Sequence, residues 1–143
     1  MSDTKNSTRA PEPVGLYPHA RTVGNLLFLS GVGPRERGMK AIPGVELNSD
    51  GTICNYDIEK QCHSVFKNVR AILEDAGSSW ENLVDVTVYL TNMKADFPVY
   101  NKLWAEYFHQ NPPCRTTLEI NALPTPIAIE LKCVAVLNSV KGL

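Results

Sequence analysis

The sequence lacks the features that mark a membrane protein, a nucleic-acid binder or a secreted domain. None of its apolar runs approaches the roughly 20 residues that cross a bilayer. The opening MSDTKNSTRAPEP contains no apolar signal segment. The chain has 14 basic and 15 acidic residues, and no two basic residues are adjacent. The sequence therefore contains no basic stripe of the kind that binds nucleic acid. We expect a cytoplasmic protein without a membrane or nucleic-acid partner.

Metal-binding and disulfide patterns are also missing. The four cysteines form no CxxC pair, and the three histidines stand far apart along the chain. Without a secretory signal, the cysteines are expected to be free thiols in a reducing compartment. The spacing predicts no metal site.

The composition that is present fits one globular domain. The chain has 143 residues, of which 43% are hydrophobic and 20% charged. Residues 1–13 are polar and interrupted by prolines, which predicts a flexible N-terminal arm. Residues 14–143 then form the single catalytic domain.

Apolar periodicity predicts an α+β fold. Gly33 to Asn55 form a long loop containing short strand pieces, whereas the segment after Asp57 repeats apolar residues at helical spacing until Gly77. Asp57 is the expected N-cap, and Gly77 the expected left-handed residue at the end. The expected strands are residues 17–23 at an edge, 25–32, 83–90, 115–121 and 127–137, with helices at 58–76 and 96–109. This order favours one mixed sheet with two helices packed on one face.

The last two strands are predicted to form a hairpin. A symmetric loop would bring the following four residues to one face of the sheet: Arg115, Thr117, Glu130 and Lys132. The final strand carries apolar residues at both odd and even positions, for instance Leu131 and Val134. This pattern is typical of a strand that is buried on both sides. Since the helices cover one face, we expect another subunit to cover the other.

Arg115 and Glu130 allow two interpretations on spacing alone. They could form a surface salt bridge, worth about 0–1 kcal/mol. Alternatively they form a site, because a guanidinium grips a carboxylate through two parallel bonds and a glutamate can deprotonate water. The aromatic residues of the second helix, including Tyr100 and Trp104, are interpreted as core or interface residues.

Several segments closely resemble the RidA family, also called YjgF/YER057c-like. The resemblance covers residues 16–136 and includes Tyr17, Asn101, GNLLFLSG (24–31), DVTVYLTNM (85–93), PCRTT (113–117) and IAIELKCVAV (127–136). It implies a chorismate-mutase-like α+β fold, a trimer with a central barrel and sites between subunits, and cofactor-free hydrolysis of enamines and imines to keto acids and ammonia. By matching position, Arg115 would hold the substrate carboxylate and Glu130 would activate water. Tyr17, Gly31, Asn101 and Thr117 would line the pocket. Thr117 stands where many relatives have cysteine, so a thiol role there is absent.

Within that family the long loop at residues 35–55, together with residues 56–80 and 113–132, looks most like the 2-aminomuconate deaminase branch. That resemblance implies hydrolysis of 2-aminomuconate to 4-oxalocrotonate and ammonia in aromatic catabolism, by a homotrimer or homohexamer. The distal carboxylate of this dicarboxylate needs a cation, for which the candidates are Arg35, Arg37, Lys40, His19 and Arg21. Two alternatives stay open: a broad 2-iminoacid deaminase, and a non-catalytic acid-binding or chaperone-like oligomer.

Overall fold

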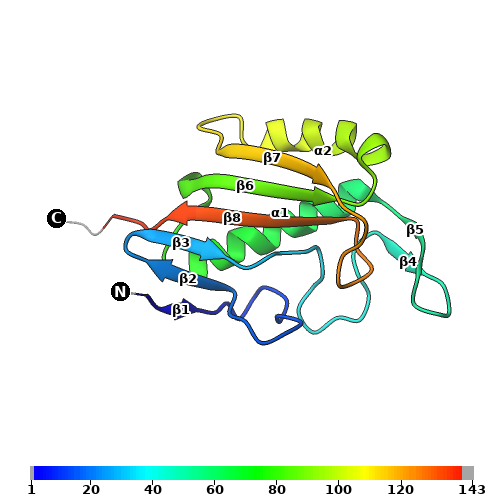
Figure 1. Cartoon of the computed structure of the whole chain (residues 1–143), viewed down its shortest axis with the longest axis horizontal. Helices are drawn as coiled ribbons and strands as arrows, with labels where there is room; N and C mark the ends of the chain where they lie inside the picture. Colours follow the sequence, from blue (N-terminus) through cyan, green and yellow to red (C-terminus); the bar gives the residue numbers. More distant parts are fainter. Residues whose placement is uncertain (1, 140–143) are drawn as a thin grey trace.

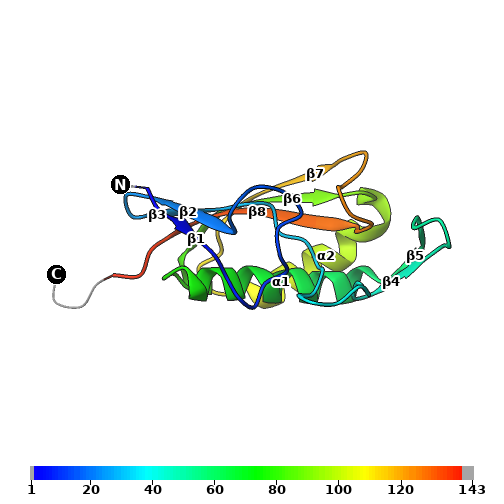
Figure 2. The ribbon, with the colours of Figure 1, turned by 90° about the horizontal axis from the view of Figure 1, so that it is seen from below.

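The computed structural model describes residues 2–139 and contains one mixed sheet whose helices both lie on one face (Figures 1 and 2). The elements are β1 Thr4–Lys5, β2 Ala20–Val23, β3 Leu26–Leu29, β4 Val45–Leu47, β5 Ile53–Tyr56, α1 Ile58–Asp75, a 3-10 turn Trp80–Asn82, β6 Leu83–Leu90, α2 Met93–Tyr107, β7 Cys114–Glu119 and β8 Ile129–Val136. The sheet order is β1-β2-β3-β8-β6-β7, and β4 pairs only with β5. The predicted α+β fold is confirmed. No helix among the described residues is long and apolar enough to span a membrane.

The predicted hairpin of the last two strands is wrong. β6 lies between them, parallel to β7 and antiparallel to β8 (Figure 1). Residues 120–128 connect β7 to β8, and nine residues are long enough to pass over one strand. The periodicity of a strand shows which of its residues point to the same face. It does not show beside which strand the chain pairs after a long connection. The strand at residues 20–23 is not an edge either, because β1 pairs outside it.

Both helices begin at a side-chain cap. Asp57 accepts from the Lys60 backbone N–H at 3.2 Å, and Gly77 follows α1 with a φ of 90°, as predicted. α2 starts three residues earlier than expected, because Asn92 accepts from the Ala95 N–H at 3.1 Å. Pro98 lies inside this helix, beyond its first turn.

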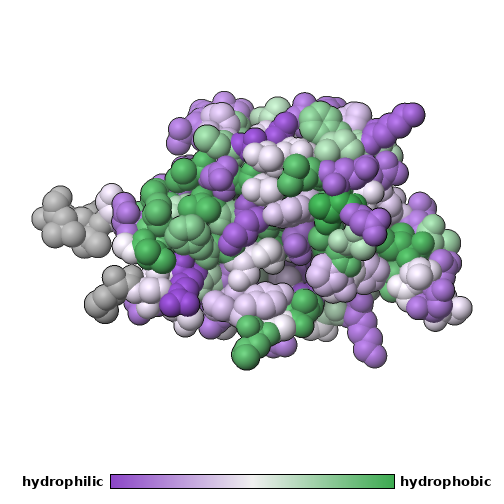
Figure 3. All heavy atoms as spheres, in the orientation of Figure 1, coloured by the Kyte–Doolittle hydropathy of each residue, from purple (hydrophilic) through white to green (hydrophobic). Residues whose placement is uncertain are grey.

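The two faces of the sheet differ in what covers them. The odd-numbered residues of β8, from Ile129 to Ala135, are buried under the helices. The even-numbered ones point to the opposite, uncovered face and are only half-buried. On that face apolar side chains gather over the ends of β2, β3 and β8 (Figure 3), where Val23 and Phe28 are 52% and 37% exposed. An apolar sheet face of this kind is typical of a surface that another chain covers.

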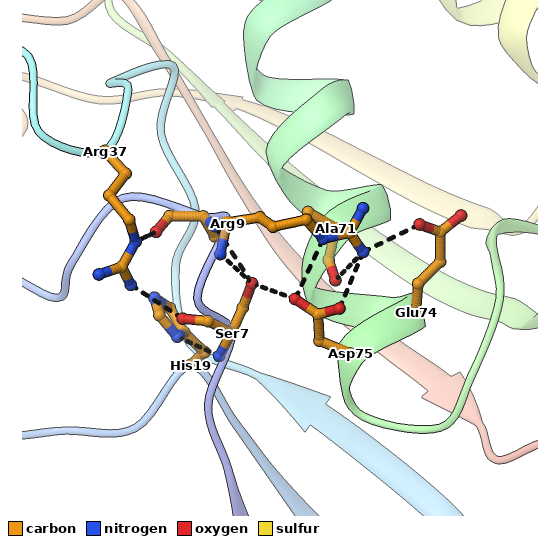
Figure 4. Close-up of polar contacts among 8 residues, drawn as sticks. Ser7, Arg9, His19, Arg37, Ala71, Glu74 and Asp75 are labelled. Carbon is orange, nitrogen blue, oxygen red and sulfur yellow. Dashed lines mark hydrogen bonds and ion pairs between the residues drawn. The ribbon is translucent and has the colours of Figure 1, made fainter.

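The N-terminal segment is packed against the domain, which differs from the expected flexible arm. β1 pairs with β2, and Ser7 and Ala10 are buried. The Ser7 hydroxyl donates to Asp75 at 2.6 Å, and Arg9 contacts the same carboxylate at 2.9 Å (Figure 4). These partners lie more than 60 residues away along the chain, so no local pattern announces the contact.

Candidate functional site

Arg115 and Glu130 point to opposite faces of the sheet. Arg115 pairs with Val86, which is buried under the helices, and residues paired across strands point to the same side. Glu130 pairs with Tyr89, three residues further along β6, and therefore points to the uncovered face. The register of β7 relative to β8, read across β6, differs by one residue from that of the predicted hairpin. A shift of one residue moves a strand side chain to the opposite face of the sheet. The prediction that one face holds all four polar residues is therefore wrong: Arg115 and Thr117 lie on one side, Glu130 and Lys132 on the other.

Three aromatic rings of α2 surround the Arg115 guanidinium. Its central carbon lies 5.7 Å from the ring centre of Phe97, 5.3 Å from that of Tyr100 and 5.1 Å from that of Trp104. These separations are within the range of cation–π attraction. The ion pairs among residues 2–139 all belong to Arg9 and Arg37, so Arg115 has no carboxylate partner there. A half-buried guanidinium without a carboxylate is suited to bind an acid from outside.

Two buried hydroxyl groups beside Arg115 make no hydrogen bond of good geometry, although the Tyr100 phenol interacts with both Arg115 and Thr117. They are the phenol of Tyr100, whose side chain is fully buried, and the Oγ1 of Thr117. Burial raises the pKa of Tyr100, while the charge of Arg115 opposes that rise. Asn101 follows Tyr100 on α2 and is exposed. Tyr100 was predicted to be a core or interface residue, because an apolar stripe on a helix gives no sign of a nearby guanidinium.

The Glu130 carboxyl lies against the backbone of Gly31. A Cβ built on Gly31 would come within 2.8 Å of Glu130 Oε2, so a larger residue would displace the carboxyl. Burial raises the pKa of Glu130 above its ordinary value, and the positive charge of Arg35 partly offsets this effect. A carboxyl with a raised pKa takes up a proton more readily than a free glutamate, which suits a general base.

Gly31, which the Glu130 carboxyl contacts, also lines a cavity of about 30 Å³. It is lined by Tyr17, His19, Gly31, Arg35 and residues of the N-terminal segment. The volume is far below the several hundred Å³ of typical ligand pockets, so one chain alone does not enclose a substrate here. The Tyr17 hydroxyl accepts from the Val14 N–H at 3.2 Å, and the ring remains 40% exposed.

Of the five cations considered for a second carboxylate, only Arg35 is placed to act on Glu130. The Arg37 guanidinium donates hydrogen bonds to the carbonyls of Ala10 and Ser7 (Figure 4). His19 is buried, with Nδ1 accepting from the Ser7 N–H and Nε2 2.7 Å from the Pro11 carbonyl. Arg21 bonds Ser2, and Lys40 lies in the exposed loop. Arg35 itself donates to the Glu12 carbonyl at 2.9 Å.

The predicted site residues thus fall into two groups. We call Arg115 and Thr117, with the α2 aromatics, the arginine half-site, and Asn101 lies exposed on the same helix. We call Tyr17, Gly31, Glu130 and Arg35 the glutamate half-site. The first can bind an anion and the second can activate water, but they lie on opposite faces of one chain. Among residues 2–139 no three His, Cys, Asp or Glu side chains are grouped as metal ligands.

Comparison with known proteins gives consistent matches along the chain. A family model described as Endoribonuclease L-PSP matches residues 7–137. A RutC family protein of Pyrococcus abyssi is 36% identical over 127 residues, covering 89% of this chain and 91% of that protein. The protein of Arabidopsis thaliana named Reactive Intermediate Deaminase A, chloroplastic, is 33% identical over 132 residues, covering 92% of this chain and 64% of the relative.

The fold is matched by solved structures as well. The crystal structure of the YjgF gene product from E. coli superposes with a TM-score of 0.78 at 26% identity, covering 94% of this chain and 98% of that one. Neither this structure nor the two sequence relatives is named for 2-aminomuconate.

The electrostatic coupling in the glutamate half-site can be measured directly. We expect the pKa of Glu130 to lie above that of a free glutamate and to rise further in Arg35→Gln, because the opposing positive charge is removed. An NMR titration of side-chain carboxyl carbons reports this value. Arg70→Gln is the matched control, since Arg70 lies over Trp80 on the helical side. An unchanged Glu130 pKa in Arg35→Gln would contradict this assignment.

Proposed function

The chain belongs to the RidA/YjgF family, whose model is described as Endoribonuclease L-PSP, and we propose that it hydrolyses reactive 2-imino acids and their enamines to keto acids and ammonia. The observation that carries this proposal is that one chain holds both a guanidinium without a carboxylate partner, Arg115, and a half-buried carboxyl of raised pKa, Glu130. The name of the plant relative, Reactive Intermediate Deaminase A, supports it.

The reaction needs three contributions from the protein. Arg115 holds the carboxylate next to the imine carbon, which fixes the orientation of the substrate. Glu130 takes a proton from water as its oxygen bonds to the carbon of the protonated imine, giving a carbinolamine. Glu130 then returns that proton to the nitrogen, and it accepts the proton of the new hydroxyl group as the C–N bond breaks and a keto acid and ammonia leave. One water is consumed for each ammonia released.

We further propose that each site combines the arginine half-site of one copy with the glutamate half-site of another. A small imino acid cannot contact both faces of one sheet, whereas the edge strand β7 of one copy can approach the uncovered face of a neighbour. The apolar end of that face supports such an association. The arrangement agrees with a trimer whose sheets form a central barrel, with or without stacking into a hexamer.

Two other activities are less well supported. A pure acid binder gains nothing from a carboxyl beside the bound anion, so Glu130 argues for turnover. The family description names an endoribonuclease, and a nuclease activity would require the chain to bind a polyanion. The chain instead carries a net charge of −1 and has no clustered basic residues. Incubation with RNA alongside the imine assay distinguishes these activities. The cytoplasmic location stays a prediction, since the plant relative is named as chloroplastic.

2-Aminomuconate is a narrower candidate substrate. Only one observation favours it, namely that Arg35 lies beside Glu130 and is held by a carbonyl rather than by a carboxylate. An arginine in this position is suited to a second carboxylate at the far end of the substrate. The broader 2-iminoacid activity requires no such contact.

Replacing the two central residues should affect different kinetic constants. We expect Arg115→Ala to lower kcat/KM for 2-iminobutanoate by about 100-fold or more, because charged hydrogen bonds to the substrate are lost. Glu130→Gln should lower kcat by about 100- to 10,000-fold with a smaller change in KM. Ammonia release from imine generated in place measures both. Full activity of either variant would contradict the proposal.

The narrower candidate is tested by a ratio of substrates. If Arg35 binds a distal carboxylate, Arg35→Ala should reduce turnover of 2-aminomuconate about tenfold more than that of 2-iminobutanoate. Lys40→Ala, in the same loop but exposed, should leave the ratio unchanged. If the ratio is unaltered in Arg35→Ala, Arg35 does not bind a distal carboxylate, and it no longer supports a dicarboxylate substrate.

A further inference from the structure

The aromatic residues around Arg115 form a cage that the family resemblance does not assign to the site. The cage consists of Phe97, Tyr100 and Trp104, all on α2, with ring centres 5.1 to 5.7 Å from the guanidinium carbon. Tyr100 is fully buried and Trp104 is 8% exposed, so the rings themselves are fixed by packing. The cage therefore restrains the guanidinium from the helical side.

Holding an arginine with rings differs chemically from holding it with an acid. A carboxylate would occupy the planar fork of N–H donors and would compete with the substrate. Aromatic faces attract the positive charge without accepting those bonds in their place. Within residues 2–139 no acid pairs with Arg115, so its fork is kept for an incoming carboxylate.

Two buried hydroxyls lie next to this fork. The Tyr100 phenol interacts with Arg115 and Thr117, yet neither Tyr100 Oη nor Thr117 Oγ1 makes a hydrogen bond of good geometry. A buried hydroxyl without a partner is costly, and a ligand oxygen that accepts from it recovers that cost. The phenol is protonated, and therefore a donor, at neutral pH, and burial raises its pKa further.

We propose that Tyr100 is a substrate-binding residue: its ring orients Arg115, and its hydroxyl, together with that of Thr117, donates to the carboxylate that Arg115 grips. A carboxylate has about four acceptor positions, of which a bidentate arginine uses two. The two hydroxyls supply donors for the others. This inference rests on the proposed binding of an acid at Arg115, and it adds the residues that complete the anion site.

The test compares two phenol deletions on the same helix. Tyr100→Phe keeps the ring of the cage and removes only the hydroxyl. Tyr107→Phe is the matched control, because its hydroxyl bonds His63 at 2.6 Å rather than facing Arg115. The probe is 2-oxobutanoate, a keto acid of the product class, whose binding is measured by calorimetry without any turnover.

We expect Tyr100→Phe to weaken 2-oxobutanoate binding about tenfold, and Thr117→Val to do the same. In the imine assay Tyr100→Phe should raise KM with little change in kcat, because the carboxylate keeps its charge throughout the reaction. Its Tm should be unchanged or higher, since a buried hydroxyl that makes no hydrogen bond of good geometry has been removed. Tyr107→Phe should bind the keto acid as the wild type does.

Other outcomes would overturn the inference. Wild-type affinity in Tyr100→Phe would show that the phenol does not touch the ligand. A lowered Tm with equal weakening in Tyr107→Phe would indicate a merely structural role, and a wild type that does not bind 2-oxobutanoate would remove the anion site. If the wild type binds the keto acid but releases no ammonia from the imine, the proposed function fails while the binding comparison still decides the role of Tyr100.

Discussion

The alternation of side chains along β7 and β8, with β6 between them, is the constraint on which the whole account depends. It directs Arg115 toward the helices and Glu130 toward the uncovered face. Because the two side chains leave opposite faces of the sheet, one small acid does not reach both groups within a single chain. Chemistry that needs both groups must therefore combine two copies of the protein, which makes assembly part of the proposed mechanism.

The two half-sites achieve opposite electrostatic tasks by different means. The arginine half-site keeps a charge available by surrounding it with aromatic rings instead of acids. The glutamate half-site raises the proton affinity of a carboxyl by burial and limits that rise with Arg35. Both rely on packing that forms when the chain folds, so the groups are oriented before a substrate arrives.

The sequence predicted the parts of the fold that are determined locally. Asp57 and Gly77 bound α1 as their chemistry requires, and the helical and strand periodicities gave the correct element types. Long-range relations were not accessible. The nine-residue connection before β8 looked like a hairpin but passes over β6, and the partner of Arg9 lies 66 residues away. For the site, the resemblance supplied Arg115 and Glu130, whereas Tyr100 was hidden in an ordinary apolar stripe.

A subunit-complementation assay tests the shared site most directly. Arg115→Ala and Glu130→Gln chains would be unfolded together, refolded as mixed oligomers and assayed for ammonia release from 2-iminobutanoate. Random mixing of two equally abundant chains should restore about one quarter of the wild-type activity, because each site needs an intact residue from each neighbour. Mixtures no more active than the separate variants would contradict a site built from two copies.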